Sequence, residues 1–511
     1  MKVYTPDNMR AADKYTIENL NVPGTHLMDR AAQTLFCELE PHLGKTKKFV
    51  ILCGKGNNGG DGFALAKKLS ESFENAVCIS VFGKPTTNDA LHFYNLCENL
   101  STPDCKVTLI DAEENPDIAI QETETADVIV DAIFGTGFDG EISENSLCAR
   151  LIELANSTSA FRLSADIPSG ANAFSGAVSK IVFCADTTVT FAKGKIGMFS
   201  YPARDYCGKI IISDIGIPES VFKSFDSKYE VTDDAAVRHY LPKRYANSNK
   251  GSYGKLLVVA GSTDMTGAAH LALSGALRFG AGLVAFASTP YVTNVIKHRL
   301  SEPVFLSLSD SEQDTDKLIE YSKSCSAVLI GCGLGSGTKT KDKVIRLIKE
   351  CDCPIILDAD GINTIVPNIN VITEAKKGIL LTPHPLEFSR IAGKPLSHIL
   401  SNRLECAVEF SKAYGCTVLL KGAGTLICGK DGRVCINPIA CSALSKGGSG
   451  DVLAGMIASF AAQGASLYES AVCGAYLHAM AGKELSLELS EYGVLPSDIP
   501  MCAAKILSRL I

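Results

Sequence analysis

The feature that most constrains the fold is an alternation of short β-rich runs with helical patterns, which occurs twice along the chain. The first series lies between Lys48 and about Pro218, and the second runs from Lys255 to the C-terminus. Parallel strands must be joined by crossover segments of about a dozen residues, usually helices. Each series therefore predicts a doubly wound parallel sheet with ligands at the strand ends. The sequence as a whole predicts an α/β protein of two domains.

The predicted strands and the domain boundary follow from these patterns. In the first series the strands are 49–53, 76–81, 107–110, 128–132, 162–165, 187–191 and 210–212. In the second they are 256–259, 284–287, 327–330, 354–357, 378–381 and 417–420. Before the first series, Asp7 to about Glu40 predicts two helices broken at Val22–Gly24. The passage between the two series is polar, and we predict domains of residues 1–225 and 226–511.

Charge and hydropathy limit the classes of partner that the protein can have. The net charge of −7 gives no support to binding of nucleic acid or of an anionic membrane. The N-terminus has no apolar signal core, and no segment approaches the roughly 20 apolar residues that span a bilayer. We therefore expect a cytoplasmic enzyme that acts on small molecules, without nucleic acid or membrane.

The cysteines predict a reducing environment. There are 19 of them, scattered through apolar runs, and the one close pair, Cys351 and Cys353, lacks the spacing of a zinc site. We expect buried free thiols rather than disulfides or metal ligands.

A glycine-rich stretch near the C-terminus, Ser442–Gly455, is the first candidate site. Gly447, Gly448 and Gly450 precede an apolar stripe that predicts a helix ending at Gly464. Unpaired backbone N–H groups at such a helix start bind phosphate. Asp451 in the same turn would hold or deprotonate a hydroxyl next to the transferred phosphoryl group. An ordinary turn with Asp451 as a first-turn acid fits this stretch equally well.

The N-terminal series carries a second candidate site. The strand 49–53 runs into a glycine-rich turn, Gly54–Gly62, followed by a helical segment 63–69, an order that would cradle a pyrophosphate. Two later strands end at Asp131 and Asp166. Together with Asn58 and Ser169, Asp131 would supply hard oxygen ligands for a group I or II cation. Asp131 and Asp166 could instead be loop caps.

Several motifs in order resemble the NAD(P)H-hydrate epimerase domain across about residues 1–220: Asn57–Asp61, Val130–Gly137, Ala165–Gly170 and Asp214–Pro218. The resemblance implies interconversion of the R and S epimers, at C6, of hydrated NADH or NADPH. It implies a potassium ion held by Asn58, Asp131 and Ser169, and it places Asp166 nearest the chemistry. The residues that it assigns to the hydrated dinucleotide are Asn57, Asn58, Gly59, Gly60, Asp61, Gly135, Thr136, Gly137, Phe138, Asp139, Gly140, Glu141 and Asp166.

Further polar groups stand at strand ends in the second series. Glycines fill Gly331–Gly335, two acids follow Leu357, His384 and Glu387 lie at a turn with two prolines, and Lys421 ends a strand. The segment 430–432 predicts a hairpin turn. The segment 266–278 is rich in small residues, which we attribute mainly to close helix packing.

With the Asp451 turn, this order resembles the ribokinase-like fold, and more narrowly the ADP-dependent NAD(P)H-hydrate dehydratase domain, over about residues 240–505. The resemblance implies ADP with Mg²⁺, Asp451 facing the substrate hydroxyl, and AMP and phosphate as products. Implied substrate contacts are Ala268, Gly333, His384, Pro385, Leu386, Glu387, Phe388, Ser389, Arg390 and Asp451. Implied nucleotide contacts are Lys421, Gly422, Ala423, Gly424, Thr425, Cys441, Ser442, Ala443, Leu444, Ser445, Lys446, Gly447, Gly448, Ser449 and Gly450.

The chain departs from that pattern in two places. Cys332 stands where many relatives have proline, and Ser445–Lys446 stands where a pair of alanine and threonine is usual. Lys446 could change the nucleotide preference.

Together the two resemblances predict a Rossmann-like doubly wound α/β/α sandwich followed by a ribokinase-like α/β domain. The predicted function is repair: the N-terminal domain epimerises hydrated NAD(P)H and the C-terminal domain dehydrates the S form with ADP. We also expect a homo-oligomer. The alternative is a ribokinase-like small-molecule kinase with an N-terminal nucleotide-binding or scaffold domain, because a Gly-Ser-Gly-Asp turn also serves kinases.

Overall fold

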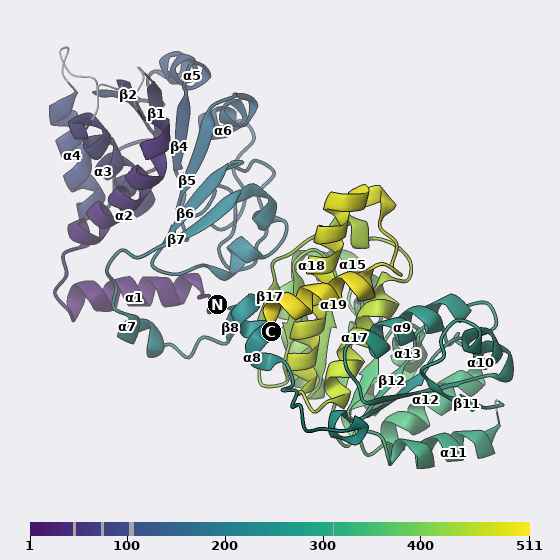
Figure 1. Ribbon diagram of the computed structural model, residues 1–511. Coiled ribbons are helices and arrows are strands. Elements are labelled where there is room, and N and C mark those ends of the chain that lie inside the picture. The colour runs from purple at the N-terminus through teal and green to yellow at the C-terminus, as the bar shows by residue number, and fades with distance from the viewer. Residues whose placement is uncertain (44–46, 73–75, 102–106, 310) are drawn as a thin grey trace. The chain divides into compact units, whose positions relative to one another are not determined.

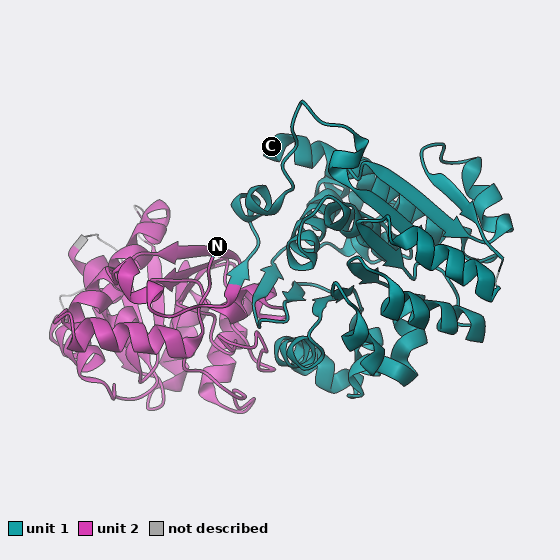
Figure 2. Cartoon of the chain, turned by 90° about the horizontal axis from the view of Figure 1, so that it is seen from below, with its two compact units in different colours: residues 1, 230–511 teal, residues 2–229 magenta. Residues whose placement is uncertain are grey.

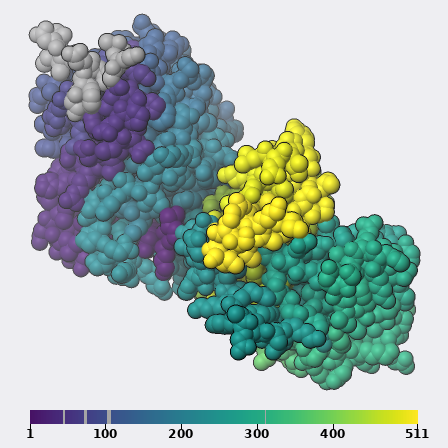
Figure 3. All heavy atoms as spheres, in the orientation of Figure 1, coloured from purple at the N-terminus to yellow at the C-terminus, as the bar shows by residue number. Residues whose placement is uncertain are grey.

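The computed structural model describes residues 1–43, 47–72, 76–101, 107–309 and 311–511. The chain divides into two compact units, Lys2–Tyr229 and Glu230–Ile511, the second also containing Met1 (Figure 2). We call them the N-terminal and C-terminal domains and describe each by itself. In the space-filling view, the last helices of the chain, in yellow, form part of the surface of the C-terminal domain (Figure 3).

The N-terminal domain contains a parallel sheet in the strand order β3-β2-β1-β4-β5-β6-β7 (Figure 1). The strands are β1 Lys48–Cys53, β2 Ala76–Val81, β3 Val107–Asp111, β4 Val128–Ala132, β5 Phe161–Ala165, β6 Thr187–Phe191 and β7 Lys209–Ser213. The helices are α1 Pro6–Glu18, α2 Gly24–Leu39, α3 Asn57–Ser72, α4 Asn88–Leu100, α5 Pro116–Glu124, α6 Leu147–Ser157 and α7 Glu219–Lys223. This is the doubly wound order, with its reversal between β1 and β4.

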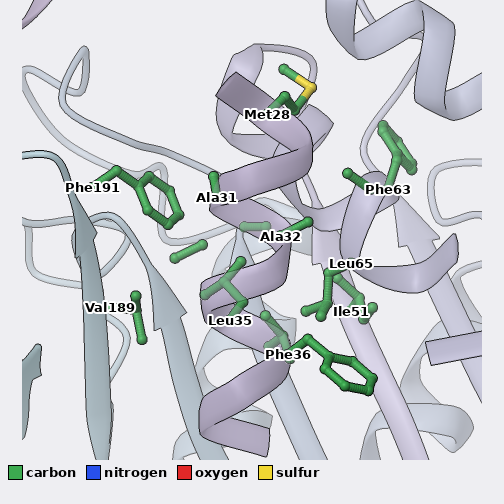
Figure 4. Close-up of a cluster of buried hydrophobic side chains, with 14 of the residues drawn as sticks. Met28, Ala31, Ala32, Leu35, Phe36, Ile51, Phe63, Leu65, Val189 and Phe191 are labelled. Carbon is green, nitrogen blue, oxygen red and sulfur yellow. The ribbon is translucent and has the colours of Figure 1, made fainter. Parts of the chain in front are cut away.

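Two apolar layers enclose this sheet. On one face, side chains of α2 such as Ala31 and Leu35 point toward the strands and pack near Ile51 of β1 and Val189 of β6 (Figure 4). Residues of α5 and α6 form a second cluster with Val50 and others on the opposite face. Because successive residues of a strand point to opposite faces, neighbours such as Val50 and Ile51 belong to different clusters. Burial on both faces explains why the strands read as continuous apolar runs.

The C-terminal domain contains a larger sheet in the order β11-β10-β9-β12-β13-β14-β15-β16-β17-β8. Its strands are β8 Tyr229–Val231, β9 Lys255–Val259, β10 Leu283–Ser288, β11 Val304–Ser307, β12 Ala327–Ile330, β13 Ile355–Leu357, β14 Ile379–Leu381, β15 Thr417–Leu420, β16 Thr425–Cys428 and β17 Val434–Asn437. The strands β9 to β15 pair in parallel, and β15, β16 and β17 pair antiparallel. The order reverses between β9 and β12.

The helices of this domain are α8 Asp234–Tyr240, α9 Thr266–Arg278, α10 Pro290–Lys297, α11 Glu312–Ser322, α12 Thr338–Glu350, α13 Asp360–Ile365, α14 Pro385–Ala392, α15 Leu396–Ser401, α16 Arg403–Tyr414, α17 Ser449–Ala462, α18 Leu467–Gly493 and α19 Ile499–Leu510. Helices α9 and α17 pack closely because glycines face carbonyls across their contact. A Cβ on Gly275 would lie 2.4 Å from the carbonyl oxygen of Val452, and one on Gly455 would lie 2.0 Å from that of Ala272. The prediction that small residues serve helix packing is confirmed at these positions.

The predicted strands all form, with boundaries within one residue of those expected. The strands β8, β11, β16 and β17 were not predicted, although the hairpin turn at 430–432 does join β16 and β17. Among the described cysteines all are free, and most are buried. Within the described residues, no helix is both long enough and apolar enough to cross a membrane.

One local prediction is wrong. Helix α3 begins at Asn57, so most of the predicted glycine-rich turn is helix and only Gly54–Gly56 is turn. The helical glycines serve close packing: a Cβ on Gly59 would lie 1.9 Å from the carbonyl oxygen of Gly54, and one on Gly62 would lie 2.7 Å from Cys53 Sγ. A helix start can therefore contain several glycines when the strand beneath it leaves no room for side chains.

Candidate active sites

A cavity of about 970 Å³ opens at the carboxyl ends of the N-terminal strands, where their order reverses. It is lined by many of the predicted substrate contacts: Asn57, Asn58, Asp61, Gly135, Thr136, Gly137, Phe138, Asp139, Glu141 and Asp166. Gly59, Gly60 and Gly140 are not among the lining residues. A Cβ on Gly60 would meet Met28, so this glycine faces the protein interior.

Asp166 is held in an unusual way at the end of β5. Its backbone has φ +69°, a conformation that non-glycine residues rarely adopt. Its carboxylate accepts a short hydrogen bond from the Lys195 ammonium group, which is buried and also donates to Thr190 Oγ1 at 2.8 Å and to the Phe191 carbonyl at 2.9 Å. The strained backbone and the buried cation together fix one carboxylate orientation at the cavity wall.

Two further carboxyl groups line the same cavity near this ion pair. Burial raises the pKa of Asp61 well above its usual value, and the charges of Asp166 and Asp13 add to the effect. Burial also raises the pKa of Asp13 to about 6, with Lys195 opposing and Asp166 reinforcing the shift. The site thus concentrates several acids around one cation, so a proton can be held or released near neutral pH.

The predicted cation ligands are only partly assembled. Asp131 and Ser169 are in direct contact: the Ser169 backbone N–H donates to Asp131 Oδ2 at 2.7 Å and its hydroxyl donates to Oδ1 at 2.6 Å. Burial raises the pKa of Asp131 to about 6, although these bonds oppose the shift. Asn58 is buried, and neither its amide oxygen nor its amide nitrogen has a hydrogen-bond partner in the described structure. Its side chain lies against Gly135, with Oδ1 3.4 Å from where a Cβ would stand.

The predicted C-terminal site forms around the first turn of α17. Asp451 faces Cys332 and Asp358, and the three ligand atoms lie within 4.8 Å of one another. Lys421 Nζ donates to Asp358 Oδ1 at 2.7 Å and lies 3.1 Å from the position of a Cβ on Gly450. The structure therefore brings Lys421, Asp451 and the glycine-rich loop together, as the sequence predicted.

Electrostatics in this site depend on two neighbouring carboxylates. Burial raises the pKa of Asp451 to about 7, with a further contribution from the negative charge of Asp358, while a hydrogen bond from Cys332 opposes the shift. Burial alone would lower the pKa of Lys421, but Asp358 and Glu387 outweigh it and raise that pKa. Lys421 therefore stays charged, and Asp451 is poised to exchange a proton near neutral pH.

The nucleotide loop predicted at 441–450 is anchored to the end of α18. Lys446 Nζ donates to the carbonyls of Tyr492 at 2.6 Å and Val494 at 2.5 Å, and the Ser442 hydroxyl donates to Glu491. Gly448 has φ +98° and precedes α17, so the loop turns sharply into the helix. Lys446 therefore ties the loop down, and its effect on nucleotide preference stays a prediction.

The predicted substrate segment 384–390 begins α14. His384 caps the helix: its Nδ1 accepts hydrogen bonds from the backbone N–H groups of Leu386 and Glu387, and the backbone N–H of His384 donates to Glu387 Oε2. Arg390 at the other end of the segment donates to Asn363. The other two predicted contacts, Ala268 and Gly333, are adjacent, since a Cβ on Gly333 would lie 2.8 Å from that of Ala268.

Four residues of these sites had no assigned role in the sequence. Asp358 was noted only as a strand-end acid, and Asp13, Lys195 and Arg403 carried no signal. Arg403 donates to the carbonyls of Ala423, at 2.6 Å, and Lys421, and so shapes the loop 421–423 from a different helix. A lysine or arginine side chain is normally solvated, so only the fold reveals the roles of Lys195 and Arg403.

Each of the two domains matches a known protein family. Residues 24–197 match the family described as YjeF-related protein N-terminus, and residues 256–504 match NAD(P)H-hydrate dehydratase. A solved relative of the second domain is the ADP/ATP-dependent NAD(P)H-hydrate dehydratase from Bacillus subtilis, co-crystallised with ATP and Mg²⁺. It is 30% identical, with a TM-score of 0.50, over 55% of this chain and 99% of its own. The fold and sites thus define a two-domain α/β enzyme, Rossmann-like at the N-terminus and ribokinase-like at the C-terminus, as predicted.

Relatives that match nearly the whole chain give the family. The bifunctional NAD(P)H-hydrate repair enzyme Nnr from Moorella thermoacetica is 33% identical over 98% of this chain and 95% of its own length. The protein of the same name from Escherichia coli K12 is 30% identical over 97% and 92%. The chain belongs to the family of bifunctional NAD(P)H-hydrate repair enzymes, which confirms the function predicted from the sequence.

Proposed function

We propose that each domain performs one half of the repair with the residues described above. The N-terminal cavity would epimerise hydrated NADH or NADPH, and the site around Asp451 would dehydrate the S epimer with ADP. The observation that carries the proposal is that each site places a carboxylate at a strand or helix end close to a lysine. The buried Asp166 pairs with the buried Lys195, and the half-buried Asp451 lies beside Asp358, which pairs with Lys421.

In the N-terminal cavity, inversion at C6 requires a bond to that carbon to break and reform. A group that donates and accepts a proton at the C6 oxygen makes this feasible near neutral pH. Asp166 is our candidate, held in place by Lys195, and the segments 57–61 and 135–141 would bind the dinucleotide. The carboxyl groups of Asp13 and Asp61 line the same cavity and can exchange protons with Asp166.

Potassium would occupy the region between Asn58, Asp131 and Ser169. The buried, unpartnered amide of Asn58 supports this proposal, because a buried polar group normally has a partner. Hard oxygen donors suit a group I cation. A bound monovalent cation would supply positive charge for the buried Asp131 carboxylate and order the loop after β4.

In the C-terminal domain, dehydration requires a better leaving group than hydroxide. Asp451 would accept the proton of the substrate hydroxyl, while Lys421 and the N–H groups of residues 447–450 stabilise the transferred phosphoryl charge. Mg²⁺ bound with ADP would add positive charge at the phosphates. Loss of phosphate from C6 and of a proton from C5 then forms the C5–C6 double bond and restores NAD(P)H.

One assay tests both halves. Purified protein is mixed with both epimers of hydrated NADH, Mg²⁺, K⁺ and either ADP or ATP, and the recovery of NADH is followed. We expect complete recovery of both epimers with ADP. Asp451→Asn should abolish recovery, and turnover near wild type would refute its role. A stable phosphorylated product without NADH would favour the kinase alternative.

The two domains serve as controls for each other. Asp166→Asn should leave the S epimer recoverable while the R epimer is recovered only at its spontaneous rate; recovery of both at the wild-type rate would refute the assignment of Asp166. Replacing K⁺ by tetramethylammonium should slow epimer exchange, and Asn58→Leu should remove the difference between the two salts. Equal epimerisation in both salts by the wild type would exclude the potassium proposal.

We also propose a homo-oligomer. Apolar side chains near the end of α18 are exposed, with Tyr492 93% and Leu487 83% accessible, and such groups favour association. Light scattering after size exclusion gives the mass directly, and a monomer at micromolar concentration would refute this.

A further inference from the structure

A thiol lies between the two carboxylates of the C-terminal site. Cys332 Sγ and one oxygen each of Asp358 and Asp451 are within 4.8 Å of one another, and they come from the loops after β12 and β13 and from the first turn of α17. Cys332 and Asp358 are buried and Asp451 is half-buried. The chemistry proposed for this site uses the carboxylate of Asp451 but has no need of a thiol.

The two oxygens of Asp358 have different surroundings. Oδ1 accepts hydrogen bonds from Thr382 Oγ1 at 2.6 Å and from Lys421 Nζ at 2.7 Å. Oδ2 faces Cys332 Sγ at 3.6 Å. A tetrahedral zinc ion with bonds of about 2.3 Å to sulfur and about 2.0 Å to oxygen separates those two ligands by about 3.5 Å. The observed spacing of sulfur and oxygen therefore matches one edge of a zinc site without displacing Lys421.

We propose that Cys332, Asp358 and Asp451 form a binding site for a thiophilic divalent cation such as zinc or cadmium. The Cys332 thiol loses its proton to solvent as the metal–sulfur bond forms, Asp358 Oδ2 and an Asp451 oxygen bind the same ion, and water completes the shell. The open side is at Asp451, which is half-buried, whereas Cys332 and Asp358 are buried. Magnesium prefers oxygen ligands, so this site is separate from the Mg²⁺ that accompanies ADP.

The consequence is inhibition confined to one domain. An ion bound to Asp451 occupies the carboxylate that would accept the substrate proton, and its charge repels Lys421. The N-terminal cavity is lined by other residues. Zinc at low concentration is therefore expected to stop dehydration while epimer exchange continues. This consequence rests on the proposed role of Asp451, whereas the metal site itself does not.

Cadmium binding to the full-length protein tests the site without substrate. Wild type, Cys332→Ser and the control Cys351→Ser are titrated with Cd²⁺, following the ultraviolet thiolate-to-cadmium absorption and the release of protons. Cys351 is a buried thiol that donates a hydrogen bond to the Ser322 hydroxyl. The control should keep the tightest binding phase and Cys332→Ser should lose it, with affinity lower by about 10-fold or more, since even outer-shell changes cost about 10- to 100-fold. The same phase in Cys332→Ser would overturn the proposal.

The activity measurement uses the ratio of inhibition in each variant. The zinc concentration that halves NADH recovery, at fixed excess Mg²⁺ and ADP, should be about 10-fold or more higher for Cys332→Ser than for wild type or Cys351→Ser. Equal values for all three would overturn the inhibition. Cys332→Ala, checked by far-ultraviolet circular dichroism, replaces the serine variant if that one does not fold. If cadmium binding is lost as expected but inhibition is unchanged, the role of Asp451 is wrong and the metal site stands.

Discussion

Replacing Lys195 by methionine removes the cation on which the N-terminal site depends. The Lys195 side chain is 2% exposed and donates to Asp166, Thr190 and Phe191. Methionine is unbranched and only one atom shorter than lysine, but it offers no donor. Asp166 is then left with a buried charge whose partner is gone, and such a loss costs about 3–5 kcal/mol.

The effect can be read from the strand that holds these partners. Because a two-domain chain need not unfold in one step, hydrogen exchange of the β6 amides is the appropriate measure. We expect Lys195→Met to lower their protection by roughly 10²- to 4 × 10³-fold, the equivalent of a loss of about 3–5 kcal/mol at about 1.4 kcal/mol per factor of ten. Epimerase activity should fall while dehydration of the S epimer continues.

A matched control lies two residues away. Lys193 pairs with Glu219 at 2.5 Å, but these side chains are 25% and 59% exposed, so Lys193→Met should cost about 0–1 kcal/mol. In Lys195→Met combined with Asp166→Asn, the loss should be smaller than the sum of the two single losses. Equal protection in the two lysine variants would refute the argument that the buried pair holds the site.

Three further outcomes are expected. Burial lowers the pKa of His478 to about 4, below its unfolded value of 6.5, so the unfolded state binds the additional proton. The C-terminal domain should therefore lose up to about 3 kcal/mol of stability as the pH falls from about 6.5 to about 4. His478→Gln should flatten this dependence in denaturant titrations at several pH values, and an unchanged slope would contradict it. Gly455→Ala should destabilise the C-terminal domain by about 1–3 kcal/mol because the added Cβ would meet a carbonyl of α9. Gly267→Ala on α9 should be near neutral, because its Cβ would have nothing within 4 Å. Similar melting temperatures for the two variants would be inconsistent with close helix packing. Lys446→Ala should weaken ADP binding, measured by calorimetry, by about 2- to 10-fold. It removes two hydrogen bonds that hold the nucleotide loop, each worth about 0.5–1.5 kcal/mol, and only part of that free energy is expressed in binding. An unchanged affinity would show that the loop is held by its other contacts.

The glycine-rich loops show where local patterns sufficed and where they did not. Gly447 and Gly448 were predicted to open a helix that ends near Gly464, and α17 does so, because glycine conformation and apolar periodicity are local properties. In Gly54–Gly62 the same residue type was taken for a loop, yet Gly59 and Gly62 lie in a helix. A Cβ on Gly59 would meet the backbone of Gly54 in the preceding turn, and one on Gly62 would meet Cys53 of β1 and Ala132 of β4. No local sequence pattern contains these close approaches.

The sequence by itself determined where the predicted strands lie along the chain, the two α/β domains, the family, and the acids that end the strands. The strands are recognisable because burial on both faces of a parallel sheet requires continuous apolar runs that end sharply. Only the tertiary structure decided which groups face those acids. Lys195 lies 29 positions from Asp166, and Lys421 lies 63 from Asp358. Each meets its partner because the carboxyl ends of the parallel strands lie at one edge of the sheet: β5 and β6 are neighbours, and only β14 lies between β13 and β15. A lysine carries the same signal whether it is solvated or buried, so its role appears only when the fold removes the water around it.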